Sequence, residues 1–117
     1  ELYLIYPQGN YIRPADSKPY LVIGEVKYGK PILDRVITPK VSIGDASRCA
    51  LISMDSTLKS DLTVGPPIDF AVIKKDEIKI ASLKCLNMND PEFSKVCNQW
   101  SQGIFKIFDS FQRFDWE

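Results

Sequence analysis

Four carboxylates near the ends of predicted strands and loops are the first candidates for chemistry in this sequence. They are Glu25, Asp55, Asp61 and Asp69. Most acids in such positions cap a helix or carry a solvated charge. Asp69 differs because it stands inside an apolar run, where a carboxylate needs a lysine, a backbone N–H or a hydroxyl as its partner. By themselves these residues do not define a reaction.

A segment with two glycines offers a second kind of chemistry. Residues 24–30, Gly-Glu-Val-Lys-Tyr-Gly-Lys, resemble a glycine-rich turn with basic side chains, which would suggest phosphate binding. The spacing fits neither a P-loop nor a dinucleotide-binding fingerprint. The segment therefore gives little support for nucleotide binding, and we expect no cofactor.

Histidine is absent from the chain. Within these residues its absence excludes Ser-His-Asp and Cys-His catalysis and most zinc chemistry, so we expect no metal site. The three cysteines, Cys49, Cys85 and Cys97, form no CxxC pair and leave an odd number. We interpret them as reduced thiols of a cytosolic protein. A reactive thiol is the alternative, although no neighbouring base supports it.

The charge balance narrows the classes of partner. Lys plus Arg and Asp plus Glu number 15 each, so the formal net charge is zero. Proteins that bind nucleic acids usually carry a basic excess, so we expect no nucleic-acid partner. No apolar run approaches the roughly 20 residues that span a bilayer, and we expect no membrane association.

Hydrophobic periodicity predicts the elements that would position these residues. The predicted strands are residues 2–6, 11–13, 20–23, 68–73 and 78–83. The predicted helices are residues 28–37, a helix from Ser42 to near Ser60, and a helix from Asn89 or Asp90 to Phe111. Turn residues join the first two and the last two strands into hairpins. This order of hairpins and helices predicts an α+β fold with antiparallel sheets.

Three elements carry expectations about packing. The helix from Ser42 has a face of small or moderate side chains that lets it lie close to a sheet or another helix; they are Ile43, Ala46, Ala50, Ser53 and Thr57. The strand at residues 68–73 is almost continuously apolar, which predicts cover on both faces. The last helix has a long aromatic stripe, best explained by packing on a sheet, with a partner-binding face as the alternative. The aromatic residues of the tail at 113–117 offer a contact for a neighbouring subunit.

Three segments together resemble one known family. They are YPQGNYI at residues 6–12, IGEVKYGKPILDRVI at 23–37 and ALISMDSTLKSDLTVGPPIDFAVI at 50–73. They are similar to the bacterial proteasome-type proteases of the ancestral β-subunit branch, Anbu, as is the closing WSQGIF with Asp115 and Trp116. The resemblance covers nearly the whole chain and falls in the C-terminal half of the family's length.

The resemblance implies the four-layer αββα sandwich of the N-terminal-nucleophile hydrolases. Residues 1–117 would form the C-terminal half of a single proteasome-like domain, and the half with the nucleophile would be absent. In this family an N-terminal threonine is the nucleophile, its own amino group is the general base, and a lysine and an aspartate from the first half tune it. Such chemistry needs no histidine. The chain also opens at Glu1 inside a predicted strand, which suggests a cut from something longer, although tag removal or a disordered short leader would look the same.

The first supporting residue that the resemblance implies is Glu25. Proteasome β-subunits have a Gly-Ser pair beside the nucleophile at the end of a strand. This chain has Gly24 and Glu25 there, so a carboxylate replaces the hydroxyl. Glu25 would either bind the threonine amine or point elsewhere.

The other supporting residues follow from the family's Asp-x-x-Ser, which precedes a glycine stretch and an Ile-Asp strand. Alignment on Ile-Asp at residues 68–69 puts Asp61 at the aspartate and Val64 at the serine. A one-residue insertion puts Ser60 and Thr63 there instead. We predict Asp61 with Thr63 as the polar support.

The resemblance implies the C-terminal half of a cytoplasmic, proteasome-type threonine peptidase or amide-bond hydrolase. Its expected partners are the missing N-terminal half, further copies of itself and a peptide substrate. The alternative is a non-catalytic proteasome-like structural subunit, suggested by Glu25 and by the stiff turn at residues 65–67. An unrelated α+β binding module is a third hypothesis. Because a half sandwich exposes strand edges and sheet faces, we expect these residues not to fold stably alone.

Overall fold

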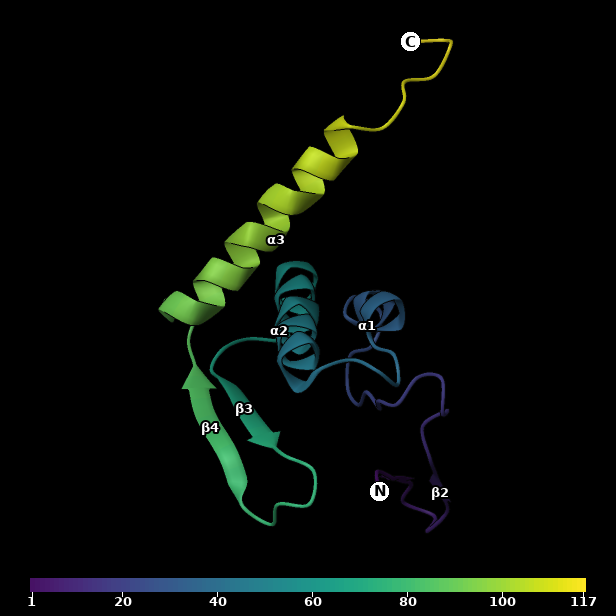
Figure 1. Cartoon of the computed structure of the whole chain (residues 1–117), viewed down its shortest axis with the longest axis vertical. Coiled ribbons are helices and arrows are strands. Elements are labelled where there is room, and N and C mark those ends of the chain that lie inside the picture. Colours follow the sequence, from purple (N-terminus) through teal and green to yellow (C-terminus); the bar gives the residue numbers. More distant parts are fainter.

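The computed structural model describes residues 1–117 and contains three helices and two antiparallel sheets of two strands each (Figure 1). The elements in chain order are β1 (Leu4–Ile5), β2 (Tyr11–Ile12), α1 (Lys30–Val36), α2 (Ile43–Ser60), β3 (Ile68–Ile73), β4 (Ile80–Leu86) and α3 (Pro91–Asp109). The α+β class predicted from the sequence is confirmed. None of the three helices has the length and apolar character needed to cross a membrane.

The helices begin at the capping residues that the sequence indicates. The Ser42 side chain accepts a hydrogen bond from the Asp45 N–H and so caps α2. The Asp90 carboxylate accepts from the N–H groups of Glu92 and Phe93 and caps α3, with Pro91 at the first helical position. α1 is shorter than predicted by two residues at its start and one at its end, and α3 ends two residues earlier than predicted.

Both predicted hairpins form. In the first, Leu4 pairs with Ile12, and Gly9 takes a positive φ of 89° in the turn, a conformation that glycine adopts without strain. In the second, Ile68 pairs with Leu86, so β4 extends three residues beyond its predicted end at residue 83. The strand lengthens because residues 84–86 find partners at the start of β3.

The predicted strand at residues 20–23 is absent. The backbone of residues 21–23 makes no hydrogen bond within the chain, and the nearest backbone bond runs from the Tyr20 N–H to the Lys18 carbonyl. A strand needs a neighbour that supplies N–H and C=O groups, and this chain provides none beside these residues. The apolar pattern indicates an extended segment, but it does not reveal whether the chain contains a strand that can pair with it.

The expectation that β3 is covered on both faces is also wrong within this chain. Ile68 is buried and Phe70 and Val72 are half-buried, whereas Asp69 and Ile73, on the other face, are exposed. Asp69 therefore does not lie in an apolar environment here. No other element of the chain packs on the face of Asp69 and Ile73, so buried or half-buried residues alternate with exposed residues along β3.

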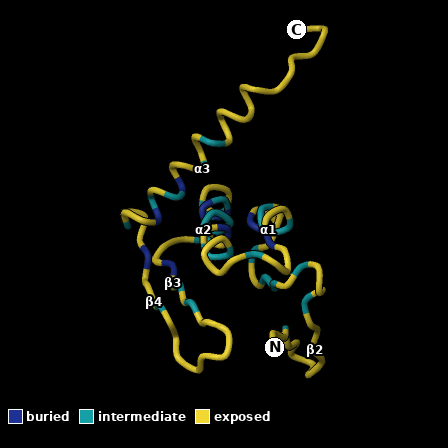
Figure 2. Tube along the Cα trace, viewed as in Figure 1, coloured by how far each residue is buried: buried dark blue, intermediate teal, exposed yellow.

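The hydrophobic core is small and lies where α2, α3 and the β3–β4 hairpin meet (Figure 2). Its buried members are Ile68, Leu86, Phe93 and Cys97, and the α2 residues Leu51, Met54 and Leu58 pack against them. Only the first half of α3 takes part in this core, because every residue from position 104 onward is exposed. Packing on a sheet therefore explains only the start of the aromatic helix.

The chain is more open than a complete domain of its size. A folded protein of this mass exposes about 6,500 Å², whereas this chain exposes 9462 Å². Its radius of gyration is 16.7 Å, against about 13 Å for a compact domain of this length. The difference in surface is about 3,000 Å² on this chain alone, which exceeds the roughly 1,000–2,500 Å² that each partner buries in an obligate interface.

α1 and α2 approach closely through Gly29, the residue before α1. A Cβ atom at Gly29 would lie 2.3 Å from the Ser53 Oγ and 3.2 Å from the Thr57 Oγ1 of α2. Both residues belong to the predicted face of small and moderate side chains on α2. The close approach predicted for that face is thus confirmed where α1 begins.

Gly29→Ala should destabilise the full-length protein by about 1–3 kcal/mol, because the added methyl group forces Ser53 to move. Urea unfolding of the variant measures this change. Gly44→Ala is the matched control. A Cβ at Gly44, inside α2, meets only the Ser42 side chain at 3.9 Å, so helix propensity should leave stability unchanged or raise it by up to about 1 kcal/mol. Equal losses in the two variants would contradict the close approach.

Candidate functional site

The end of α2 holds the two predicted residues that interact directly. The backbone leaves the helix at Asp61, whose N–H still donates to the Thr57 carbonyl at 2.9 Å. The Asp61 Oδ1 then accepts two hydrogen bonds from Thr63, one from its N–H at 2.8 Å and one from its Oγ1 at 2.7 Å. Aspartate commonly stabilises a turn by bonding the backbone two residues ahead. Asp61 and Thr63 thus form one polar unit.

This unit keeps its carboxylate ionised. The hydroxyl of Thr63 lowers the pKa of Asp61 most, and the Thr63 N–H and the positive charge of Lys27 lower it further. Each of these groups favours the charged form of a carboxylate. Asp61 therefore presents a fixed negative charge at neutral pH.

The segment that carries Glu25 lies beside the end of α2. Gly29 lies against Thr57, one turn before Asp61, and against Ser53, two turns before it. Lys27 is close enough to act on the Asp61 carboxylate. Gly24 takes a positive φ of 77°, which turns the chain just before Glu25. The segment that contains the predicted residue Glu25 therefore lies beside the predicted pair Asp61 and Thr63.

Glu25 itself does not join the Asp61–Thr63 unit. Its Oε1 accepts a hydrogen bond from the N–H of Lys27 at 2.8 Å, which closes a local turn. No hydrogen bond links Glu25 to Asp61 or Thr63. Lys27, noted in the sequence only as a basic residue of the segment at 24–30, is the residue that connects the two segments electrostatically.

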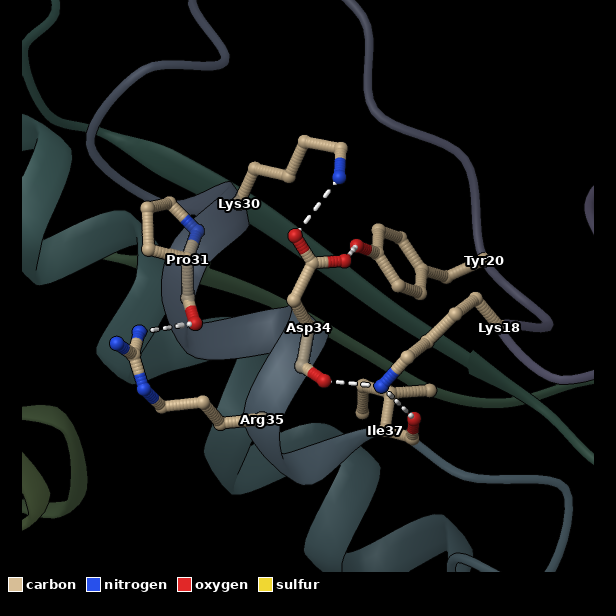
Figure 3. Close-up of polar contacts among 7 residues, drawn as sticks. All are labelled: Lys18, Tyr20, Lys30, Pro31, Asp34, Arg35 and Ile37. Atoms are coloured by element: carbon tan, nitrogen blue, oxygen red, sulfur yellow. Dashed lines mark hydrogen bonds and ion pairs between the residues drawn. The ribbon is translucent and has the colours of Figure 1, made fainter.

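A polar network on α1 anchors the chain that leads to Glu25 (Figure 3). The Lys18 ammonium donates to the carbonyl oxygens of Asp34 and Ile37 and so caps the C-terminal end of α1. The Tyr20 hydroxyl donates to one carboxylate oxygen of Asp34, and the Lys30 Nζ lies 2.8 Å from the other. Lys30 first and Tyr20 second hold the pKa of Asp34 below its usual value. Residues 18–20 are thereby tied to the helix.

A second network joins α2 to α3. The carboxyl group of Asp55 is buried, and the Lys59 Nζ lies 2.8 Å from its Oδ2. The same ammonium donates to the Ser101 Oγ of α3 at 3.2 Å. Burial and the nearby Asp55 charge raise the pKa of the Cys97 thiol to about 11. The four-residue spacing of Asp55 and Lys59 is visible in the sequence, but Cys97 and Ser101 could be added only from the fold.

The three cysteines are free thiols. Burial raises the pKa of Cys49, and desolvation followed by the Asp69 charge raises the pKa of Cys85. Since the thiolate is the reactive form, these shifts disfavour a thiol nucleophile at neutral pH. The three free thiols agree with the interpretation of reduced cysteines, and their cytosolic location stays a prediction.

Solved structures with the same architecture identify the family. The chain is 41% identical to the Anbu (Gly-1) mutant from Hyphomicrobium sp. strain MC1, with a TM-score of 0.91 over 97% of this chain and 49% of that chain. For Anbu from Yersinia bercovieri the identity is 40% and the TM-score 0.92, over 97% of this chain and 48% of that chain. Over the length that it spans, the chain belongs to the Anbu family.

A third Anbu structure, described as a helical assembly of the complex from Pseudomonas aeruginosa, is 41% identical to the chain. Its TM-score is 0.89, over 96% of this chain and 46% of that chain. The chain therefore spans about half the length of these Anbu structures. No protein-family model matches the sequence, and no curated protein matches it.

Proposed function

We propose that residues 1–117 form the C-terminal half of a proteasome-type threonine peptidase, an amide-bond hydrolase that assembles with copies of itself. The observation that carries this proposal is the match to Anbu, which spans 97% of the chain but 49% of the Anbu chain. The other half of the αββα sandwich, including the nucleophile, would come from an N-terminal segment. A cytoplasmic location belongs to the same proposal, since unpaired thiols suit a reducing compartment.

The open surface of the chain supports a missing half. Completing strands would pair with residues 21–23, whose backbone N–H and C=O groups have no partner within the chain. They would also cover the exposed face of β3, which carries Asp69 and Ile73. The excess of about 3,000 Å² over a complete domain, counted on this side only, is at least as large as the area that one partner buries in an obligate interface.

In the proposed chemistry the hydroxyl of an N-terminal threonine attacks the amide carbon, and its amino group accepts the proton and returns it to the leaving amine. The Asp61–Thr63 unit would support that amino group with a carboxylate that stays ionised. The Glu25 carboxylate, which accepts a hydrogen bond from the backbone N–H of Lys27, would contribute a second negative charge nearby. All three act on the nucleophile, which lies outside residues 1–117.

The proposal is tested on the full-length protein with a peptide-based electrophile and intact-mass analysis. We expect one adduct, located on the N-terminal threonine. Conversion of that threonine to alanine should abolish the adduct and leave the assembly unchanged. If the encoding gene has no upstream half with a maturable nucleophile, or if no adduct forms, the enzymatic proposal fails.

A supporting role for Thr63 predicts a change in pH dependence. Thr63→Val removes the hydroxyl that lowers the pKa of Asp61 most, so that pKa should rise. A carboxylate with a lowered pKa contributes above that pKa and loses its effect as the pH falls through it. The acidic limb of the pH–rate profile should therefore move to higher pH in the variant, and kcat/KM should fall by up to about a hundredfold.

Thr63→Ser keeps the hydroxyl and is the matched control, for which the wild-type profile is expected. Asp61→Asn should remove the acidic limb attributed to this carboxylate. If Thr63→Val lowers activity without moving the acidic limb, Thr63 has only a structural role.

A non-catalytic, proteasome-like structural subunit is the second candidate function. The observation that favours it is the local turn at Glu25, whose carboxylate accepts a hydrogen bond from the N–H of Lys27. In catalytic proteasome subunits a serine hydroxyl stands at this position, so the replacement by a carboxylate engaged in a local turn favours a subunit without catalysis. This candidate predicts the same assembly but no adduct with the electrophile. The intact-mass experiment thus separates the two functions.

A further inference from the structure

Asp55, Lys59 and Ser101 make a polar contact between α2 and α3 that the proposed chemistry does not use; these three residues are called the α2–α3 bridge. Asp55 is only 2% exposed, and its Oδ2 lies 2.8 Å from the Lys59 Nζ. The same ammonium donates a hydrogen bond to the Ser101 Oγ at 3.2 Å. Lys59 is the only cation that pairs with this buried carboxylate. One side chain therefore both neutralises a buried charge and joins two helices.

A buried ion pair of this kind is better explained by geometry than by stability. Apolar side chains of similar volume often stabilise a protein as well or better, because a buried charge loses its hydration. A hydrogen bond forms only when its donor and acceptor lie about 3 Å apart, whereas apolar side chains can pack in several neighbouring arrangements. The α2–α3 bridge therefore selects one position of α2 against α3.

We propose that Lys59 is a positioning residue for the proposed threonine peptidase and that it acts through Asp61. By joining Asp55 to Ser101, Lys59 fixes the last turn of α2 and with it the place of the Asp61 carboxylate. The inference rests on the proposed function and adds to its site a residue outside Glu25 and the Asp61–Thr63 unit.

The backbone connects Lys59 to Asp61 within one helical turn. The Asp61 N–H donates to the Thr57 carbonyl at 2.9 Å, so helical hydrogen bonding continues as far as Asp61. The carbonyl groups of a last turn have no partner within the helix, and helix ends fray. Lys59 lies in this last turn. Its side-chain contact with α3 therefore holds the residues that lead into Asp61.

The other side of α2 carries the contacts of Asp61 with the segment before α1. Thr57 lies against Gly29. Asp61, four residues later, is close enough to Lys27 for the ammonium to act on its carboxylate. Lys59 is two residues from Thr57, and residues two apart in a helix point about 200° from each other. The end of α2 is thus held between α1 and α3 (Figure 1), and loss of the contact with α3 frees it to move away from Lys27.

Removal of Lys59 alone would mix position with stability, because it leaves the buried Asp55 carboxylate without a cation. The test therefore uses the double variant Asp55→Asn, Lys59→Met in the full-length protein, which removes both charges and nearly keeps both volumes. We expect its urea unfolding to resemble that of the wild type. At saturating peptide-based electrophile, the rate of adduct formation should fall about 10- to 100-fold, because a supporting group misplaced by about 1 Å slows chemistry by that order. The half-saturating electrophile concentration should stay unchanged.

Four further measurements separate position from other effects. Ser101→Ala removes the α3 end of the bridge without touching the ion pair, and should lower the rate at unchanged stability. Lys59→Arg keeps a cation with N–H donors and should retain most of the wild-type rate. Lys95→Met makes the same lysine substitution at an exposed position of α3 and should change neither rate nor stability. A wild-type rate in the double variant or in Ser101→Ala overturns the proposal; if the double variant does not fold, Ser101→Ala decides.

Amide hydrogen exchange, the fourth measurement, tests the position of Asp61 without catalysis. In the double variant the Asp61 N–H, bonded to the Thr57 carbonyl in the wild type, should exchange about tenfold faster, because local opening costs less when a contact is lost. The Ile37 N–H, bonded to the Leu33 carbonyl at the end of α1, is the internal control and should be unaffected. Unchanged exchange at Asp61 overturns the proposal.

The two proposals fail in different ways. If the wild-type protein forms no adduct, the peptidase proposal fails, and amide exchange still decides whether Lys59 holds Asp61 in place. If every variant forms the adduct at the wild-type rate, the peptidase proposal stands and Lys59 has no part in it.

Discussion

The isolated 117-residue chain is expected to melt without a cooperative transition. Its buried hydrophobic residues number six: Ile37, Cys49, Ile68, Leu86, Phe93 and Cys97. Each of its two sheets has only two strands, and a two-stranded hairpin is at best marginally stable in water. With so little apolar surface removed from water, the conformational entropy of ordering the chain is not offset. The free energy of unfolding should therefore lie near zero, against about 5–15 kcal/mol for a complete domain.

Differential scanning calorimetry of the isolated chain measures this directly, with the full-length protein as the control. We expect a broad, nearly featureless trace for the chain and a sharp transition for the full-length protein. Coexpression with the N-terminal half as a separate polypeptide should restore the transition. A sharp transition of the monomeric chain alone would refute the proposal that a second half completes its core.

The second large effect is expected for Phe93→Ala in the full-length protein. Phe93 is 1% exposed and lies in the core with Ile68, Leu86 and Cys97. It is also in the first turn of α3, where its N–H is held by the Asp90 carboxylate. Truncation of a buried phenylalanine removes its transfer free energy and leaves a cavity, which together cost about 3–5 kcal/mol.

Urea unfolding at a fixed protein concentration measures this loss, because the stability of an oligomer depends on concentration. Ile78→Ala deletes an apolar side chain that is fully exposed in the β3–β4 turn, and it should change stability by less than about 0.5 kcal/mol. Phe93→Leu, which keeps most of the volume, should lose less than Phe93→Ala. Similar losses at positions 93 and 78 would mean that Phe93 does not anchor α3.

The helices were predictable because their signals are local. Ser42 and Asp90 accept backbone hydrogen bonds from residues two or three positions ahead, and proline at position 91 follows the cap directly. These interactions lie within one turn of the chain, so the sequence contains both partners. The face of small side chains on α2 was predictable for the same reason.

The predictions that were wrong concern contacts between residues that are distant in the sequence. Residues 20–23 and the apolar run of β3 have the composition of sheet, but a strand needs partners that can be distant in the chain. Asp61 and Thr63 were selected through the resemblance to the family's Asp-x-x-Ser, and their hydrogen bonds to each other span only three residues. The approach of Lys27 to Asp61 depends on how α1 sits against α2, and nothing in the local pattern around residue 27 indicates it.

The Lys59 ammonium connects the buried Asp55 of α2 to Ser101 of α3. Ser101 lies at the point along α3 where the packed residues end and the exposed residues begin. From Ser101, α3 continues to Asp109, a length of about 12 Å at 1.5 Å per residue. If this segment of α3 tilts by about 10° at Ser101, its end at Asp109 moves by about 2 Å. This one contact therefore helps to set the direction in which the exposed end of α3 leaves the packed part of the chain.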